Sequence, residues 1–114
     1  MELELRHKGI AIDPSLRDLV ASHIQSALGR FAHRIRGVTV QLLDTNGQRG
    51  GIDKYCGIAV RLSSGKTIRA RELNTQVVAA FYFAVDRAAC AVSRELARRL
   101  TRARRTRPWN AEAE

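Results

Sequence analysis

The most distinctive chemical groups in this chain are arginines that recur at helical spacing near its C-terminal end. Five of them fall on one side of a helix predicted over residues 74–107, at about 100° per residue: Arg87, Arg94, Arg98, Arg102 and Arg105. Only Asp86 and Glu95 accompany the eight arginines between Arg87 and Arg107. A row of guanidinium groups with so few acids favours a polyanionic partner, and a solvated charged face is the alternative.

Further basic residues lie on a predicted first helix and in loops, namely Arg30, Arg34, Arg49, Lys54 and Lys66. If the two helices pack side by side, their inner flanks form a basic channel that suits the phosphates of a folded RNA. Little in this set reads base edges, so recognition of RNA shape is the natural mode. The outer face of the predicted sheet, with Thr39, Gln41, Arg61, Arg69 and Arg71, offers a second possible surface. Tyr55 is the one aromatic residue expected there, which disfavours a stacking sheet of the RRM kind.

No set of polar side chains forms a catalytic or metal-binding pattern. The chain has no nucleophile elbow, P-loop or dinucleotide-binding glycine motif. Its glycine-rich residues 47–51 join two predicted strands, whereas a phosphate cradle would need a helix after it. The three histidines share no metal-ligand spacing, and Cys56 and Cys90 are predicted to face the core as inert thiols. We therefore expect no enzyme activity, no cofactor and no metal.

Length and charge restrict the class of protein. The 114 residues fit one domain, and an apolar content of 45% supports a packed core. With 20 Lys+Arg against 11 Asp+Glu, the net charge is +9 and the pI is near 11.0, which favours nucleic acid or an anionic surface as partner. The charged N-terminal residues do not resemble a signal peptide, and no stretch is apolar enough to cross a membrane. Two cysteines without C-x-x-C spacing then fit a reducing cytoplasm.

Two helices position the basic residues. Asp13 and Pro14 supply an N-cap and a first-turn proline for the first helix, which is predicted to end near Arg36 with Gly37 as its C-cap. The second helix is predicted to start at Asn74 and to stop before Pro108. Its apolar side carries Val78, Phe81, Val85, Ala88, Val92, Leu96, Leu100 and Ala103.

Alternating polar and apolar residues predict four strands, over residues 2–6, 38–42, 55–62 and 67–73. The order predicts an α+β fold of the β-α-β-β-β-α kind. A right-handed crossover makes the first two strands parallel, and the remaining strands form an antiparallel meander. Because each helix has one apolar stripe, both are expected on one face of the four-stranded sheet. Residues 1–107 then form a single domain, followed by a flexible C-terminal tail at 108–114.

Three stretches resemble a known family. The sequence Tyr-Phe-Ala-Val-Asp at residues 82–86 resembles the Tyr-Ala-Ala-Ile-Asp signature of ribosome hibernation promoting factors, a family that includes ribosome-associated inhibitor A and the sigma-54 modulation proteins. Positions that resemble the family's last helix are Arg94, Leu96, Arg98 and Arg102. Positions that resemble its first helix are Leu16-Arg17, Phe31, Arg34 and Ile35. The resemblance covers about residues 3–105, and the order of elements is also the family's order.

The resemblance implies a short-form hibernation factor, without the C-terminal domain that long forms use to pair ribosomes. Such proteins bind the small ribosomal subunit in the channel for tRNA and mRNA, and so block translation during stress. Carried over by position, Arg94, Arg98 and Arg102 would contact ribosomal RNA. His23 stands where the family usually has a lysine in its first helix.

The chain also departs from the family pattern. Cys90-Ala91 replaces an acid–lysine pair that follows the signature, and a second lysine of the first helix is missing near Ser26. Arg30 and Arg87 are candidates to compensate for these losses.

Two other classes of function remain open. One is a module of the double-stranded-RNA-binding type, whose sheet and paired helices look similar. The concentration of basic residues in the second half of the last helix disfavours it. The other is a basic protein-interaction domain whose arginines meet an acidic protein surface, and resistance of binding to RNase would favour that class.

Overall fold

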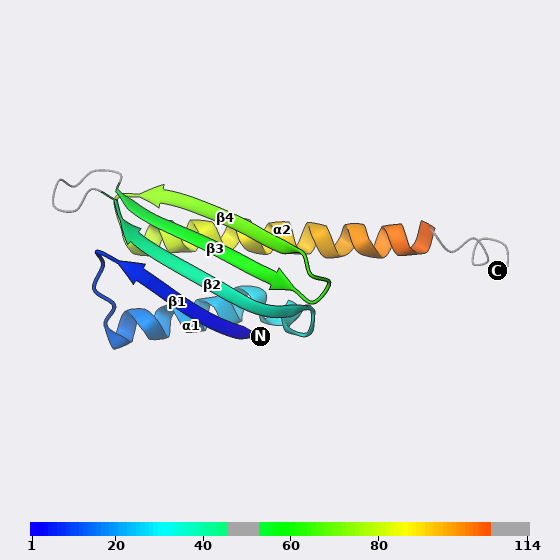
Figure 1. The fold of residues 1–114 in the computed structure, drawn as a ribbon, viewed down its shortest axis with the longest axis horizontal. Helices are drawn as coiled ribbons and strands as arrows, with labels where there is room; N and C mark the ends of the chain where they lie inside the picture. The colour runs from blue at the N-terminus through cyan, green and yellow to red at the C-terminus, as the bar shows by residue number, and fades with distance from the viewer. Residues whose placement is uncertain (46–52, 106–114) are drawn as a thin grey trace.

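The computed structural model describes residues 1–45 and 53–105, with side chains described through Thr101. The elements, in chain order, are strand β1 (Glu2–Lys8), helix α1 (Pro14–Leu28), the 3-10 helix η1 (Gly29–Arg34), strands β2 (Ile35–Asp44), β3 (Lys54–Leu62) and β4 (Thr67–Asn74), and helix α2 (Val77–Arg105). The predicted β-α-β-β-β-α order and α+β class are confirmed (Figure 1). The glycine-rich residues 47–51 and the predicted tail at 108–114 lie outside the described residues.

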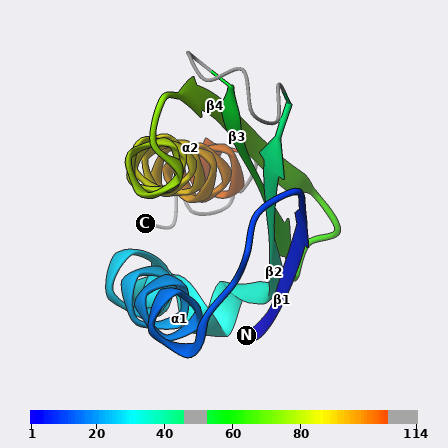
Figure 2. The same cartoon turned by 90° about the vertical axis from the view of Figure 1, so that its left-hand side faces the viewer.

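The four strands form one sheet in the order β1-β2-β3-β4. β1 pairs with β2 in parallel, and β2 with β3 and β3 with β4 are antiparallel, as the crossover argument predicted. Both helices lie on the same side of the twisted sheet, so its other face carries no helix (Figure 2). This arrangement gives the protein two surfaces on opposite sides of the sheet, one helical and one made by strands.

A single apolar core lies between the sheet and the two helices. α2 packs along β3 and β4, with Phe81, Val85 and Val92 almost fully buried. α1 contributes Val20, Ile24 and Leu28 to the same cluster. Each such side chain stabilises the fold by about 1.5–3 kcal/mol relative to an exposed position, so the helices are held firmly where they carry basic residues.

The predicted end of the first helix was wrong. α1 ends at Leu28, not near Gly37, and η1 tightens the chain over the next six residues before β2 begins at Ile35. Gly29 weakens the helix at this point, since glycine costs about 1 kcal/mol relative to alanine in a helix interior. Ile35 is buried and pairs with Leu62, and Gly37 lies within β2 at a register shift rather than at a helix end.

The long helix differs from the prediction at its start and at one core position, and its predicted end at Arg107 lies outside the described residues. α2 begins at Val77 rather than Asn74, although the Asn74 side chain still accepts a hydrogen bond from the Gln76 N–H at 3.1 Å. Its C-terminal turns extend past the sheet (Figure 1). Leu100, predicted to be on the core side, is therefore 51% exposed.

Among residues 1–45 and 53–105, no helix combines the length and apolar character needed to cross a bilayer. In the same part of the chain, no three His, Cys, Asp or Glu side chains are grouped as a metal site would require.

Candidate nucleic-acid interface

The exposed side of α2 carries the predicted row of arginines. Arg87, Arg94 and Arg98 are all exposed, opposite the buried band that contains Phe81 and Val92. Arg102 and Arg105 lie on the last turns of the same helix, and their side chains are outside the described part of the chain. The helix therefore presents three described guanidinium groups on about three of its turns.

A groove runs between α1 and α2 and brings basic residues of the two helices together. Its lining combines charged, hydroxyl, thiol and small residues, namely Ser26, Ala27, Arg30, Asp86, Ala89, Cys90, Ser93 and Arg94. Arg30 comes from η1, directly after α1, and Arg94 from α2. The expectation that the inner flanks of the helices form a basic channel is supported at these two residues, with Asp86 as an acidic member.

The η1 segment positions its two arginines by local contacts. The Arg30 guanidinium carbon lies 4.6 Å from the centre of the Phe31 ring, a cation–π contact that restrains the side chain while leaving its charge available. The Arg34 carbonyl accepts a hydrogen bond from the Ser63 N–H at 2.9 Å, which ties η1 to the turn between β3 and β4. Both arginines are exposed.

His23, a predicted RNA-binding residue, is part of the packing between the helices. Its ring lies 4.5 Å from that of Tyr82 and 5.6 Å from that of Phe81, both in edge-on geometry. The side chain is half-buried, and its Nε2 atom is buried with no hydrogen-bond partner among the described residues. Sequence spacing placed His23 on or beside the apolar seam of the helix, and the structure agrees with that placement.

Cys90 was predicted to face the core, and this prediction was wrong. The residue is exposed and lines the groove between the helices, next to Arg94 one turn later. Cys56, in contrast, is buried as predicted, and burial raises the pKa of its thiol to about 12. The two cysteines therefore differ strongly in accessibility.

A buried carboxylate, Glu95, is an important residue that sequence reasoning missed. It is 2% exposed and lies 3.0 Å from Lys66 Nζ, 3.0 Å from Arg99 Nε and 3.4 Å from an Arg98 nitrogen. The Lys66 ammonium holds the pKa of Glu95 below its usual range, with smaller contributions from the two arginines. This cluster joins the β3–β4 turn to α2 and fixes the helix where it begins to leave the sheet.

The arginine row is therefore less free of acids than the sequence suggested. Arg87 forms an ion pair with Glu72 of β4, and Arg98 with Glu95. Among residues 1–45 and 53–101, no carboxylate forms an ion pair with Arg94. Arg94 is thus the member of the row with the most available charge in the described part of the chain.

Two lysines expected to add to the basic surface are engaged elsewhere. Lys54 lies 3.0 Å from Asp53 and 3.4 Å from Asp44, and the hydrogen bond to Asp53 raises the pKa of Lys54 above its usual value. Lys66 is paired with Glu95. Arg49, the third loop residue predicted to contribute, lies outside the described residues.

The fold and this surface define a small α+β domain with a basic helical face. The chain belongs to the family described as Sigma 54 modulation protein / S30EA ribosomal protein, whose model matches residues 3–104. The resemblance drawn from residues 82–86 and from the helices is thereby confirmed, and the protein is ribosome-associated.

Two solved structures share this fold. A ribosomal subunit interface protein from Coxiella burnetii superposes with a TM-score of 0.67 at 19% sequence identity, covering 85% of this chain and 99% of its own. The N-terminal domain of Protein Y from Thermus thermophilus gives a TM-score of 0.68 at 24% identity, covering 82% of this chain and 98% of its own. No curated protein sequence matches the chain significantly.

Proposed function

We propose that this protein is a hibernation factor that binds the small ribosomal subunit through its helical face and occupies the channel for tRNA and mRNA. The observation that carries the proposal is the placement of Arg30 and Arg94 on one groove between the helices, beside the exposed Arg87 and Arg98. Family membership supports a ribosomal partner. The Coxiella protein, with the same fold, is named a ribosomal subunit interface protein, and the channel for tRNA and mRNA is the location that the family resemblance implies.

The chemistry of the groove suits RNA. Arginine forks bind phosphate oxygens in two-point contacts, and the Ser26 and Ser93 hydroxyls add neutral donors. Asp86 repels phosphate but accepts a hydrogen bond from a ribose 2′-hydroxyl, a group that DNA lacks. The proposed contact is therefore to the backbone and shape of a folded RNA, with little reading of base sequence.

The remaining predicted site residues either extend the basic surface or support it from below. Arg34 extends the basic surface of η1 beyond Arg30, and Arg102 and Arg105 extend the row along α2. His23 acts from beneath the surface, because its contacts with Phe81 and Tyr82 set how closely the two helices approach.

The proposal is tested by sedimentation of the protein with purified ribosomal subunits. We expect the wild-type protein to pellet with the small subunit at moderate salt and the Arg30→Glu/Arg94→Glu variant to remain in the supernatant. A matched control, Arg17→Glu/Arg36→Glu, makes the same change of charge at two exposed residues outside the groove and should still bind.

Binding of the groove variant at wild-type level would refute the helical interface. Binding to the large subunit alone would refute the proposed location. Retention of binding after RNase digestion of the RNA would favour an acidic protein partner instead.

A further inference from the structure

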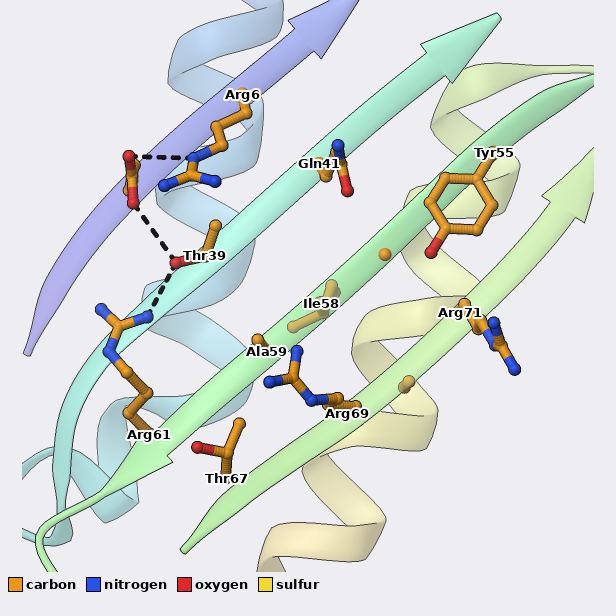
Figure 3. A pocket seen from close by; sticks show the side chains of 13 residues that line it. Arg6, Thr39, Gln41, Tyr55, Ile58, Ala59, Arg61, Thr67, Arg69 and Arg71 are labelled. Carbon is orange, nitrogen blue, oxygen red and sulfur yellow. Dashed lines mark hydrogen bonds and ion pairs between the residues drawn. The ribbon is translucent and has the colours of Figure 1, made fainter. Parts of the chain in front are cut away.

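The face of the sheet opposite the helices is uncovered (Figure 2). Side chains on this face line a shallow hollow. Pairing across the strands places Tyr55 opposite Leu73, Gly57 opposite Arg71 and Ala59 opposite Arg69, all on this face. β2 adds Thr39 and Gln41, and β1 adds Glu4 and Arg6 (Figure 3). A sheet with one buried face needs only polar residues on its other face to be soluble. The particular residues found on this face can therefore indicate a ligand.

The hollow is strongly basic. It is lined by four arginines, which are Arg6, Arg61, Arg69 and Arg71. Its one acidic lining residue, Glu4, lies 3.0 Å from Arg6 and accepts a hydrogen bond from Thr39. Within residues 1–45 and 53–101, no carboxylate forms an ion pair with Arg61, Arg69 or Arg71. This concentration of available guanidinium groups is complementary to a polyanion.

Two glycines allow flat side chains to lie directly on the strands. A Cβ atom at Gly57 would lie 2.7 Å from Tyr55 Oη and 3.1 Å from its Cε1 and Cζ atoms, so the ring rests over the glycine. At Gly37 a Cβ atom would collide with the Arg61 guanidinium, which donates a hydrogen bond to Thr39 at 2.8 Å. The hollow is thus floored by an aromatic ring and a guanidinium plane, the two groups on which unpaired bases stack.

The exposed arginines of β4 lie beside this floor. Arg69 and Arg71 are two residues apart on one strand, so their Cα atoms are roughly 6.8 Å apart. That interval is similar to the separation of successive phosphates in an extended strand. Figure 3 shows both side chains on the same face as Tyr55, along the adjacent strand. The arrangement can hold phosphates along β4 while a base lies over β3.

We propose that the outer face of the sheet binds single-stranded RNA, with successive phosphates on Arg69 and Arg71 and a base stacked on Tyr55. A duplex keeps its bases paired and stacked within the helix and cannot use the Tyr55 ring. Because this face lies opposite the helical face, the protein can hold two RNA segments at once. The inference stands on the sheet alone and does not depend on the helical groove.

The test is an NMR titration of ¹⁵N-labelled full-length protein with hexauridylate at low salt, without ribosomes. We expect amide shifts centred on β3 and β4. The Arg69→Gln/Arg71→Gln variant should lose at least tenfold in affinity, with the salt slope reduced by about 1.4, the value for two phosphates of a single strand. Tyr55→Leu should weaken binding by about 5- to 150-fold, the range for loss of one stacked base.

The matched control is Arg17→Gln/Arg36→Gln, which changes two exposed arginines that line neither the hollow nor the groove and should bind hexauridylate as the wild-type protein does. The substituted arginines are exposed, and the spectrum of each variant reports its folding directly. The proposal is overturned if the shifts map to α1 and α2, if hexauridylate does not bind, or if Tyr55→Leu binds normally. Equal binding of an RNA duplex, inorganic phosphate or polyglutamate also overturns it. Failure here leaves ribosome binding by the helices intact, and failure of ribosome binding leaves this inference intact.

Discussion

Neutralising the two arginines of the groove between α1 and α2 should change the salt dependence of ribosome binding by a calculable amount. Arg30 and Arg94 line this groove, and each can neutralise one phosphate. Each phosphate contact contributes roughly 0.7 for single-stranded and 0.9 for duplex nucleic acid to the slope of log affinity against log salt. The Arg30→Gln/Arg94→Gln variant should therefore show a slope smaller in magnitude by about 1.4–1.8.

The slope is measured by sedimentation with small subunits between about 50 and 200 mM KCl. Over this fourfold range, the affinity gap between the wild-type protein and the variant should narrow by about 7- to 12-fold. The Arg17→Gln/Arg36→Gln variant controls for total charge and should keep a slope close to that of the wild-type protein. Parallel lines for the wild-type protein and the groove variant, even at reduced affinity, would refute phosphate contact at Arg30 and Arg94.

Three further predictions concern the stability and accessibility of single side chains. Glu95→Gln should lower the melting temperature at pH 7 because it removes buried ion pairs. Because the pKa of Glu95 is lowered in the folded protein, this contribution to stability is lost as the pH falls below the usual glutamate range. A difference in melting temperature between the wild-type protein and the variant that is as large at pH 3 as at pH 7 would contradict the assignment. Thiol titration at pH 8 should detect one reactive cysteine, Cys90, in the native protein and two in denaturant, and two fast thiols in the native state would contradict the burial of Cys56. Gly57→Ala should displace the Tyr55 ring and speed its nitration by tetranitromethane, measured by peptide mapping, and an unchanged rate would contradict the contact.

The sequence carried enough information for the fold because each element has its own local signal. Apolar residues repeat every two positions in the strands and about every 3.6 positions in the helices, so the two kinds of element can be told apart. The short turn after Leu62 makes an antiparallel pairing of β3 with β4 the simplest arrangement. The end of α1 was misplaced because the apolar spacing of Leu28, Phe31 and Ile35 continues a helical pattern. Gly29 was the available signal for an earlier end, and it was given too little weight.

The candidate site was less predictable because it depends on contacts between distant residues. Glu95 looks like a surface acid on the helix, and its contact with Lys66, 29 residues away in the sequence, cannot be read from the helix alone. The orientation of Cys90 depends on the rotation of α2 against the sheet and α1, which spacing along one helix does not determine. Gly57 within a strand is a recognised sign of close approach, here by Tyr55, and it could have indicated the outer hollow in advance.

The most direct test of the central claim uses Cys90 as a native reporter of the groove between the helices. Its thiol is exposed there beside Arg94, whereas Cys56 is buried and its pKa is raised to about 12, so alkylation by a maleimide at neutral pH reports on Cys90. If the groove faces small-subunit RNA, adding small subunits should slow alkylation of Cys90 in proportion to the bound fraction, and large subunits should have no effect. An unchanged alkylation rate, with the protein shown by sedimentation to be bound, would contradict the account.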